Sequence, residues 1–291
     1  MRTILLATAA LLLTAAAPKP LTPPDLIAAA PASAWRVIPA EDLLVLDLKS
    51  GTRIVIQLAP AFAPVHVANI RQLAHSHWWD GAAIYRVQDN YVAQWGHNDE
   101  RKMPPGVVAR PPAEYDRAVR GLAFAPFPYR DAYAPTTGFA NGWPVALRGA
   151  RANLTHCYAT VGVGRDLAPD TGTGGELYAI ISGAPRALDR NISIVGRVIS
   201  GIEAMSSLPR GSAPMGFYKD RSSDTPIATT RLASDIAAAD RPSFEVMDTA
   251  SPTFARLVRL RANRHDAFYE RPAGGVDLCA SPVPIRPKPK A

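Results

Sequence analysis

The alternation of apolar and polar residues predicts mostly short strands with few helices. Two β-rich runs, at 43–48 and 53–58, flank a Lys-Ser-Gly turn and predict a β-hairpin, because glycine supplies the positive φ that such turns need. Pro64 then opens a segment whose apolar residues recur at helical spacing as far as residue 75. Later runs predict a strand, turn and strand over 84–93, and single strands at 161–163, 177–181, 192–198 and 227–232.

The middle and the two ends of the chain lack this clear pattern. Residues 97–155 are rich in proline and predict a long irregular insertion with one short strand at 145–147. Residues 18–42 are rich in alanine and proline and predict a linker with one short helix. Residues 236–291 predict a C-terminal extension with a helix near 254–262 and a frayed end from Pro282 onward. A short helix at 201–208 completes the pattern, so residues 43–235 favour a mostly-β barrel.

The first 17 residues read as a secretory signal peptide. A short basic start precedes an apolar stretch at 4–13, and small residues follow it. The stretch is shorter than the ~20 residues that a membrane-spanning helix needs. We therefore expect cleavage, no stable membrane insertion of the mature chain, and a periplasmic or secreted protein. The alternative is an uncleaved anchor.

Composition narrows the classes of protein further. Hydrophobic residues make up 47% of the 291 residues, which is enough for a sizeable core. The 28 prolines argue against a bundle of long helices, because proline breaks helix interiors. The formal net charge is +7, but the basic residues are scattered without a long run, so we expect no nucleic-acid partner.

The segment from Ala83 to Gly96 carries the most specific motif. It resembles the cyclophilin family of peptidyl-prolyl isomerases, whose pattern is Phe-His-Arg, a turn, and Phe-Met-x-Gln-Gly-Gly. Arg86, Gln94 and Gly96 match this pattern, and Tyr91 and Val92 stand for its Phe and Met. Ile84 and Tyr85 replace its Phe-His, and Trp95 replaces its first Gly. Three further blocks follow the family's order, at 47–58, 64–69 and 188–198, so the resemblance covers residues 43–232.

The resemblance implies an eight-stranded antiparallel barrel capped by two helices, here with N- and C-terminal extensions. It also implies an enzyme that needs no cofactor and acts on X–Pro bonds of proline-containing polypeptides, assisting their folding. We expect a monomer.

The matched residues suit this reaction. The X–Pro bond isomerises in tens to hundreds of seconds without a catalyst, and the peptide barrier of ~18–20 kcal/mol comes from conjugation of the nitrogen lone pair. A donor aimed at the prolyl nitrogen stabilises the twisted state, and the arginine fork of Arg86 supplies one without losing its proton. Gln94 would hold the flanking peptide. Taken alone, a strand arginine such as Arg86 is more simply interpreted as solvated or paired with Asp89, and its place in the motif is what favours the catalytic role. The expected wall of the proline pocket consists of Tyr91, Val92, Tyr178 and Leu188.

Three positions outside this segment also depart from the family pattern. Glu176 replaces a Gln that helps to shape the substrate groove, Ala187 replaces a Trp, and Ile192 replaces the pocket His. These changes support a second hypothesis, in which the chain is a peptide-binding chaperone or scaffold that isomerises poorly.

Two other patterns suggest different chemistry. Asp170-Thr-Gly resembles the signature of aspartic proteases, but these enzymes need two such loops and the chain has one. His75, His77 and His97 lack the spacing of a tetrahedral zinc set, so we expect no metal site.

The two cysteines are Cys157 and Cys279. In an oxidising compartment they have one intramolecular pairing, and we expect a disulfide that pins the extension to the barrel. The alternative is a buried Cys157 with Cys279 as a free or intermolecular thiol.

Overall fold

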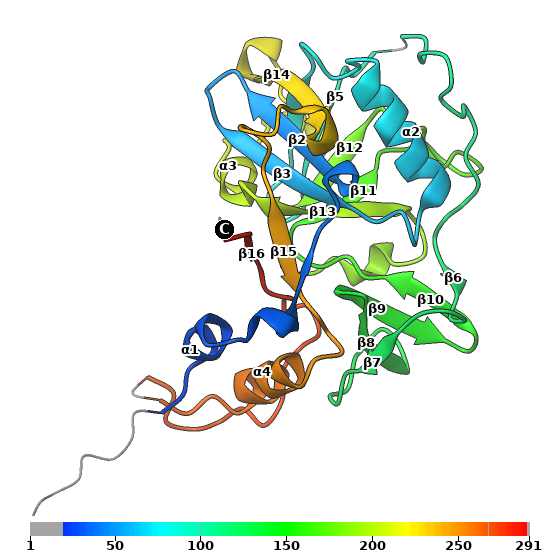
Figure 1. Cartoon of the computed structure of the whole chain (residues 1–291). Helices are drawn as coiled ribbons and strands as arrows, with labels where there is room; N and C mark the ends of the chain where they lie inside the picture. The colour runs from blue at the N-terminus through cyan, green and yellow to red at the C-terminus, as the bar shows by residue number, and fades with distance from the viewer. Residues whose placement is uncertain (1–19, 100, 267, 290–291) are drawn as a thin grey trace, which may run out of the picture.

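The computed structural model describes residues 20–99, 101–266 and 268–289, and a closed β-barrel forms its upper part in Figure 1. The strand order is β11-β12-β5-β4-β14-β2-β3-β13, and neighbouring strands are antiparallel. This confirms the eight-stranded antiparallel barrel. Its strands are β2 Leu43–Leu48, β3 Arg53–Leu58, β4 Ala83–Val87, β5 Val92–Gly96, β11 Thr160–Val163, β12 Leu177–Ile180, β13 Ile194–Ser200 and β14 Thr225–Leu232.

Two helices pack on the barrel core as expected. Helix α2 (Pro64–His75) buries Val67, Ile70 and Leu73 in this core, at the spacing of one helical face. The short helix α3 (Ile202–Ser206) adds Met205.

The ends of the chain are folded in the described residues. The N-terminal segment contains the expected short helix but also a strand, and the frayed end from Pro282 onward was a wrong prediction. Residues 20–42 contain helix α1 (Pro23–Ala28) and strand β1 (Trp35–Val37). Strand β15 (Phe244–Met247) pairs with β1 on one side and with β16 (Ile285–Pro287) on the other. Helix α4 (Pro252–Ala262) contacts α1, and both lie below the barrel (Figure 1).

Strand β2 explains why these ends fold. Leu44 and Leu46 point into the barrel, whereas Leu43 and Val45 point out into a second core shared with Phe254. A strand that is apolar on both faces needs cover on both faces, and the N- and C-terminal segments provide it.

The insertion is also more regular than expected. Its strands form a five-stranded sheet in the order β6-β10-β9-β8-β7, where the sequence predicted one strand. Asn141 and Gly142 both have positive φ at the turn between β8 and β9, as a tight hairpin requires. The strands are β6 Arg117–Ala118, β7 Phe124–Pro126, β8 Thr136–Ala140, β9 Trp143–Arg148 and β10 Arg151–Leu154.

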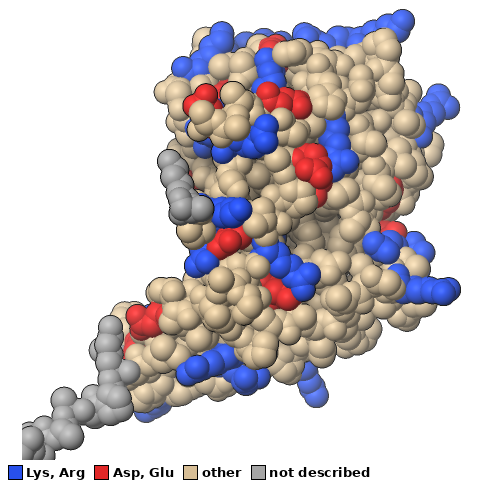
Figure 2. Space-filling view, viewed as in Figure 1, with Lys and Arg blue, Asp and Glu red and all other residues tan. Residues whose placement is uncertain are grey.

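A disulfide joins Cys157, just before β11, to Cys279 in the C-terminal segment, with Cα atoms 5.1 Å apart. The expected signal peptide at 1–17 lies outside the described residues. Within those residues, no helix combines the length and the hydropathy of a membrane span. Figure 2 shows basic and acidic side chains interspersed on one face of the molecule, without a continuous basic stripe.

Candidate active site

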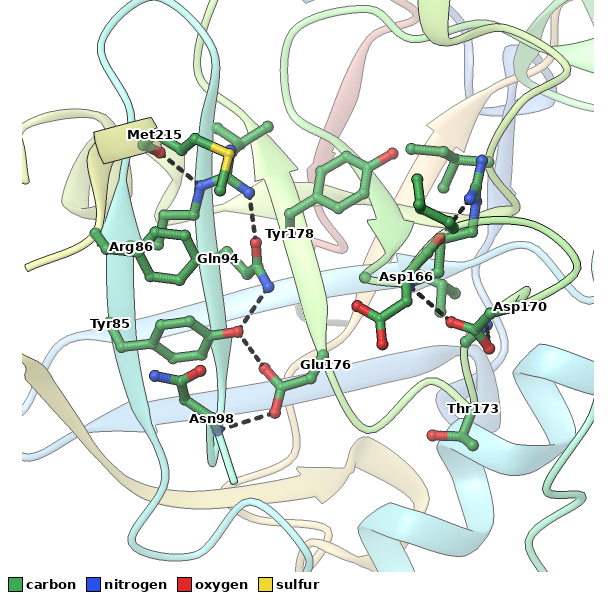
Figure 3. Close-up of a pocket in the computed structure, with 18 of the residues that line it drawn as sticks. Tyr85, Arg86, Gln94, Asn98, Asp166, Asp170, Thr173, Glu176, Tyr178 and Met215 are labelled. Carbon is green, nitrogen blue, oxygen red and sulfur yellow. Dashed lines mark hydrogen bonds between the residues drawn. The ribbon is translucent and has the colours of Figure 1, made fainter. Parts of the chain in front are cut away.

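A groove of about 910 Å³ runs across β4, β5 and β12 (Figure 3). It brings together most residues that the sequence singled out. Those that line it are Arg86, Tyr91, Val92, Gln94, Glu176 and Tyr178. Leu188 instead packs on the apolar cluster of Val92, Tyr178 and Ile180, next to the groove.

Strand register places Arg86 directly opposite Gln94. The Nη1 atom of Arg86 donates to Gln94 Oε1 at 2.9 Å, Nη2 to Gln88 Oε1 at 2.6 Å, and Nε to the carbonyl of Met215 at 2.8 Å. A guanidinium has five N–H donors, so one on each terminal nitrogen remains. Desolvation lowers the pKa of Arg86, but an arginine stays charged at neutral pH.

Arg86 does not form the ion pair with Asp89 that the sequence left open. Asp89 pairs with Arg210, at 3.0 Å, and not with Arg86. The guanidinium of Arg86 lies 5.3 Å from the ring centre of Phe217. A charge held on neutral amides and aromatic rings keeps its capacity to polarise a bound group.

A hydrogen-bonded chain continues from Gln94 into the barrel wall. Gln94 Nε2 donates to the hydroxyl of Tyr85 at 2.6 Å, and that hydroxyl donates to Glu176 Oε2 at 2.6 Å (Figure 3). Glu176 Oε1 accepts from the backbone N–H groups of His97 and Asn98. Burial raises the pKa of Glu176, although its hydrogen bonds act to lower it. Burial first, and then the neighbouring Glu176, raise the pKa of Tyr85, so its hydroxyl remains a donor.

Gly96 is needed beside this carboxylate. A Cβ added at Gly96 would overlap the carboxyl group of Glu176, which occupies the space that the missing side chain leaves. The retained glycine and the substituted Glu176 therefore fit one another.

The apolar end of the groove rests on a buried polar network. The hydroxyl of Tyr178 lies 3.0 Å from His156 Nε2, and His156 Nδ1 lies 3.0 Å from Asp189 Oδ1. Because a carboxylate only accepts, the network assigns the proton to Nδ1, and Tyr178 donates to Nε2. Arg186 binds Asp189 at 2.5 Å and Asp131 of the insertion at 2.8 Å. The insertion is thus connected to the pocket.

Sequence reasoning missed four residues of this site. Tyr85 stood inside the motif but was read only as a substitution for His. Phe217 and Met215 come from a loop outside the matched blocks, and His156 precedes β11 without a pattern of its own. Only Tyr85, flanked by Arg86 in the motif, had a signal that could have identified it.

The histidines that were considered for a zinc site make other contacts in the structure. His75 lies beside Asp235, His77 beside Asp80, and His97 contacts the Trp78 carbonyl. The described residues contain no group of three or more His, Cys, Asp or Glu side chains arranged to hold a metal ion.

The Asp-Thr-Gly segment is a loop beside the groove. Asp170 accepts hydrogen bonds from the backbone N–H groups of Asp166 and Gly172. Its carboxylate therefore stabilises its own loop.

Comparison with known proteins identifies the family. Residues 44–231 match the family model described as "Cyclophilin type peptidyl-prolyl cis-trans isomerase/CLD". The chain is 26% identical over 172 residues to a "Probable peptidyl-prolyl cis-trans isomerase" of Brucella suis and to one of Brucella abortus, covering 59% of this chain and 74% of each relative. Its fold is similar to that of cyclophilin AquaCyp293 from Hirschia baltica, with a TM-score of 0.67 at 22% identity, over 93% of this chain and 100% of that one. This chain belongs to the family of cyclophilin-type peptidyl-prolyl cis-trans isomerases.

Proposed function

We propose that this enzyme isomerises X–Pro bonds of exported polypeptides, with Arg86 and Gln94 as its catalytic residues. The observation that carries the proposal is the position of Arg86 in the groove. Its guanidinium retains an unassigned N–H on each terminal nitrogen, next to an apolar pocket.

In the proposed mechanism, Arg86 donates to the prolyl nitrogen as the peptide bond twists. The nitrogen lone pair then leaves conjugation and becomes a better acceptor, so the contact is stronger in the transition state than in the ground state. The second N–H of the Gln94 amide holds a neighbouring substrate carbonyl, because the first is engaged by Tyr85. Tyr91, Val92 and Tyr178 grip the proline ring, with Leu188 behind them, while the rest of the bond rotates.

Glu176 has a positioning role in this proposal. It fixes Tyr85, which in turn fixes the rotamer of Gln94. The carboxylate thus replaces the family's Gln at this position without entering the reaction itself.

The site of action is proposed from the sequence at 1–17 and from the Cys157–Cys279 bond, which suits an oxidising compartment. Fractionation of the cells that produce the protein, with mass measurement of its mature N-terminus, tests this. A mature chain that begins near residue 17 in the periplasm or the medium supports export. A full-length chain in the cytoplasm contradicts it.

The second candidate is a peptide-binding chaperone with weak isomerase activity. It is favoured by Ile192, which lines the groove where the family has a His. A protease-coupled prolyl-peptide assay separates the two candidates, because the protease cleaves only the trans form. Acceleration at catalytic enzyme concentrations supports the isomerase, and binding of unfolded chains without acceleration supports the chaperone.

A further inference from the structure

A second cavity lies where the barrel, the insertion sheet and the C-terminal segment meet. Its volume is about 330 Å³, and among the described residues it shares no lining residue with the isomerase groove. Most of its wall is apolar, from Phe139, Trp143, Leu154, Ile194, Leu278 and Val283.

One charged side chain, Arg197 of β13, lines this cavity. Its Nε and Nη2 atoms donate to Gln57 Oε1 at 3.0 and 2.8 Å, and Nη1 donates to the Gly142 carbonyl at 2.8 Å. The guanidinium stacks on Trp143, 4.3 Å from the ring centre. One N–H on each terminal nitrogen is left over, and an arginine N–H donates well to a carboxylate.

Arg197 has no ion-pair partner among the described residues. By contrast, Arg186, which is 3% exposed, binds two carboxylates. Desolvation lowers the pKa of Arg197 to about 9, so the side chain keeps its charge at neutral pH. A partly buried charge without a counter-charge is costly, and an anion in the cavity would offset that cost.

We propose that this cavity binds a small organic acid, with its carboxylate on Arg197 and its apolar body against the surrounding side chains. The volume lies in the range of small-molecule sites, and few polar groups set within an apolar wall are typical of such sites. An inorganic anion would satisfy Arg197 but leave the apolar wall unfilled. An aliphatic or aromatic monocarboxylate would bind Arg197 and also fill the space between the apolar side chains.

Because several parts of the chain line the cavity, a bound ligand would contact all of them. The barrel, the insertion and the segment 278–285 all contribute to its wall, and the disulfide holds that segment to Cys157. A ligand that binds only the folded state stabilises it by mass action, and this one would add contacts across the junction.

Titration calorimetry with octanoate tests the proposal, and octanamide is the neutral control of equal length. We expect one octanoate per chain, bound roughly tenfold or more tighter than octanamide at pH 7, since the difference is a charge-assisted hydrogen bond. Isomerase activity, where present, should remain unchanged when octanoate is bound, because the groove is separate. Equal binding of the two compounds, or binding of neither, overturns the proposal.

Variants locate the bound anion. Arg197→Met should abolish the preference for octanoate over octanamide, whereas Arg197→Lys should retain part of it. Arg210→Met, on the surface, should leave the preference unchanged. A preference that survives Arg197→Met in a folded protein refutes the assignment. If Arg197→Met does not fold, Arg197→Lys decides, because lysine keeps the charge but lacks the guanidinium donors and should weaken the preference. A preference that is undiminished in folded Arg197→Lys refutes the assignment.

Discussion

Replacing Arg186 by methionine tests how the insertion is attached to the isomerase pocket. Arg186 is 3% exposed and binds Asp131 of the insertion and Asp189 beside the pocket. Methionine keeps the volume of the stem but removes the guanidinium. Two carboxylates then remain in a site where water reaches them poorly.

The expected cost is about 3–5 kcal/mol of the free energy of unfolding, as for breaking a buried ion pair by removing one partner. This is a large part of the ~5–15 kcal/mol that a domain has. Burial acts to raise the pKa of Asp131, but hydrogen bonds from Arg186 and from two backbone N–H groups hold it below its usual value. A depressed carboxyl pKa stabilises the fold above the unfolded-state pKa. This stabilisation is lost as pH falls through the folded value, below about pH 4.

Urea denaturation at pH 7 and at pH 3 measures both effects. Arg36→Met is the matched control, because Arg36 pairs with Asp248 but is 67% exposed, and an exposed pair contributes ~0–1 kcal/mol. The acid-dependent loss should be smaller in Arg186→Met than in wild type, because the Asp131 contribution is already gone. If Arg186→Met costs no more than Arg36→Met, the network does not hold the insertion, and this reasoning is refuted.

Three further predictions concern the groove and the disulfide. Gln94→Ala should lower kcat/KM in the prolyl-peptide assay by roughly 10–1000-fold, as for the loss of one oriented polar contact, and a wild-type value would contradict its role. Gly96→Ala should lower kcat/KM because its methyl group displaces Glu176, and unchanged activity would show that the position of this carboxylate is unimportant. Alkylation of denatured, unreduced protein should label neither Cys157 nor Cys279, and reduction should expose both and cost up to ~4–5 kcal/mol of stability. Two labelled thiols before reduction would exclude the bond.

The barrel could be predicted because its strands carry local signals. The hairpin of β2 and β3, the helix after Pro64 and the strand pair around residue 90 each combine period and turn chemistry within about 15 residues. The terminal lobe was missed because β1 and β15 are about 210 residues apart, and each is short. The apolar outer face of β2 was the available signal, and it indicated only that some cover was needed.

The residues of the site also differ in how far local sequence determines their positions. Arg86 and Gln94 could be predicted together, because antiparallel register across a short turn brings them face to face. The Glu176–Tyr85 contact joins residues 91 positions apart and depends on the pairing of β12 with β5. Met215 and Phe217 lie on a loop whose path depends on the whole barrel, so no local pattern could assign them to the groove.

Exchange NMR on an intact X–Pro peptide is the most direct test of the isomerase. It needs no protease, and it observes cis and trans peptide together while the enzyme is present in catalytic amounts. We predict that wild type brings the two forms into exchange faster than the uncatalysed tens to hundreds of seconds. Arg86→Ala should abolish this exchange while the peptide still shifts on binding. Exchange that persists undiminished in Arg86→Ala, or is absent from wild type, would contradict the mechanism proposed for this groove.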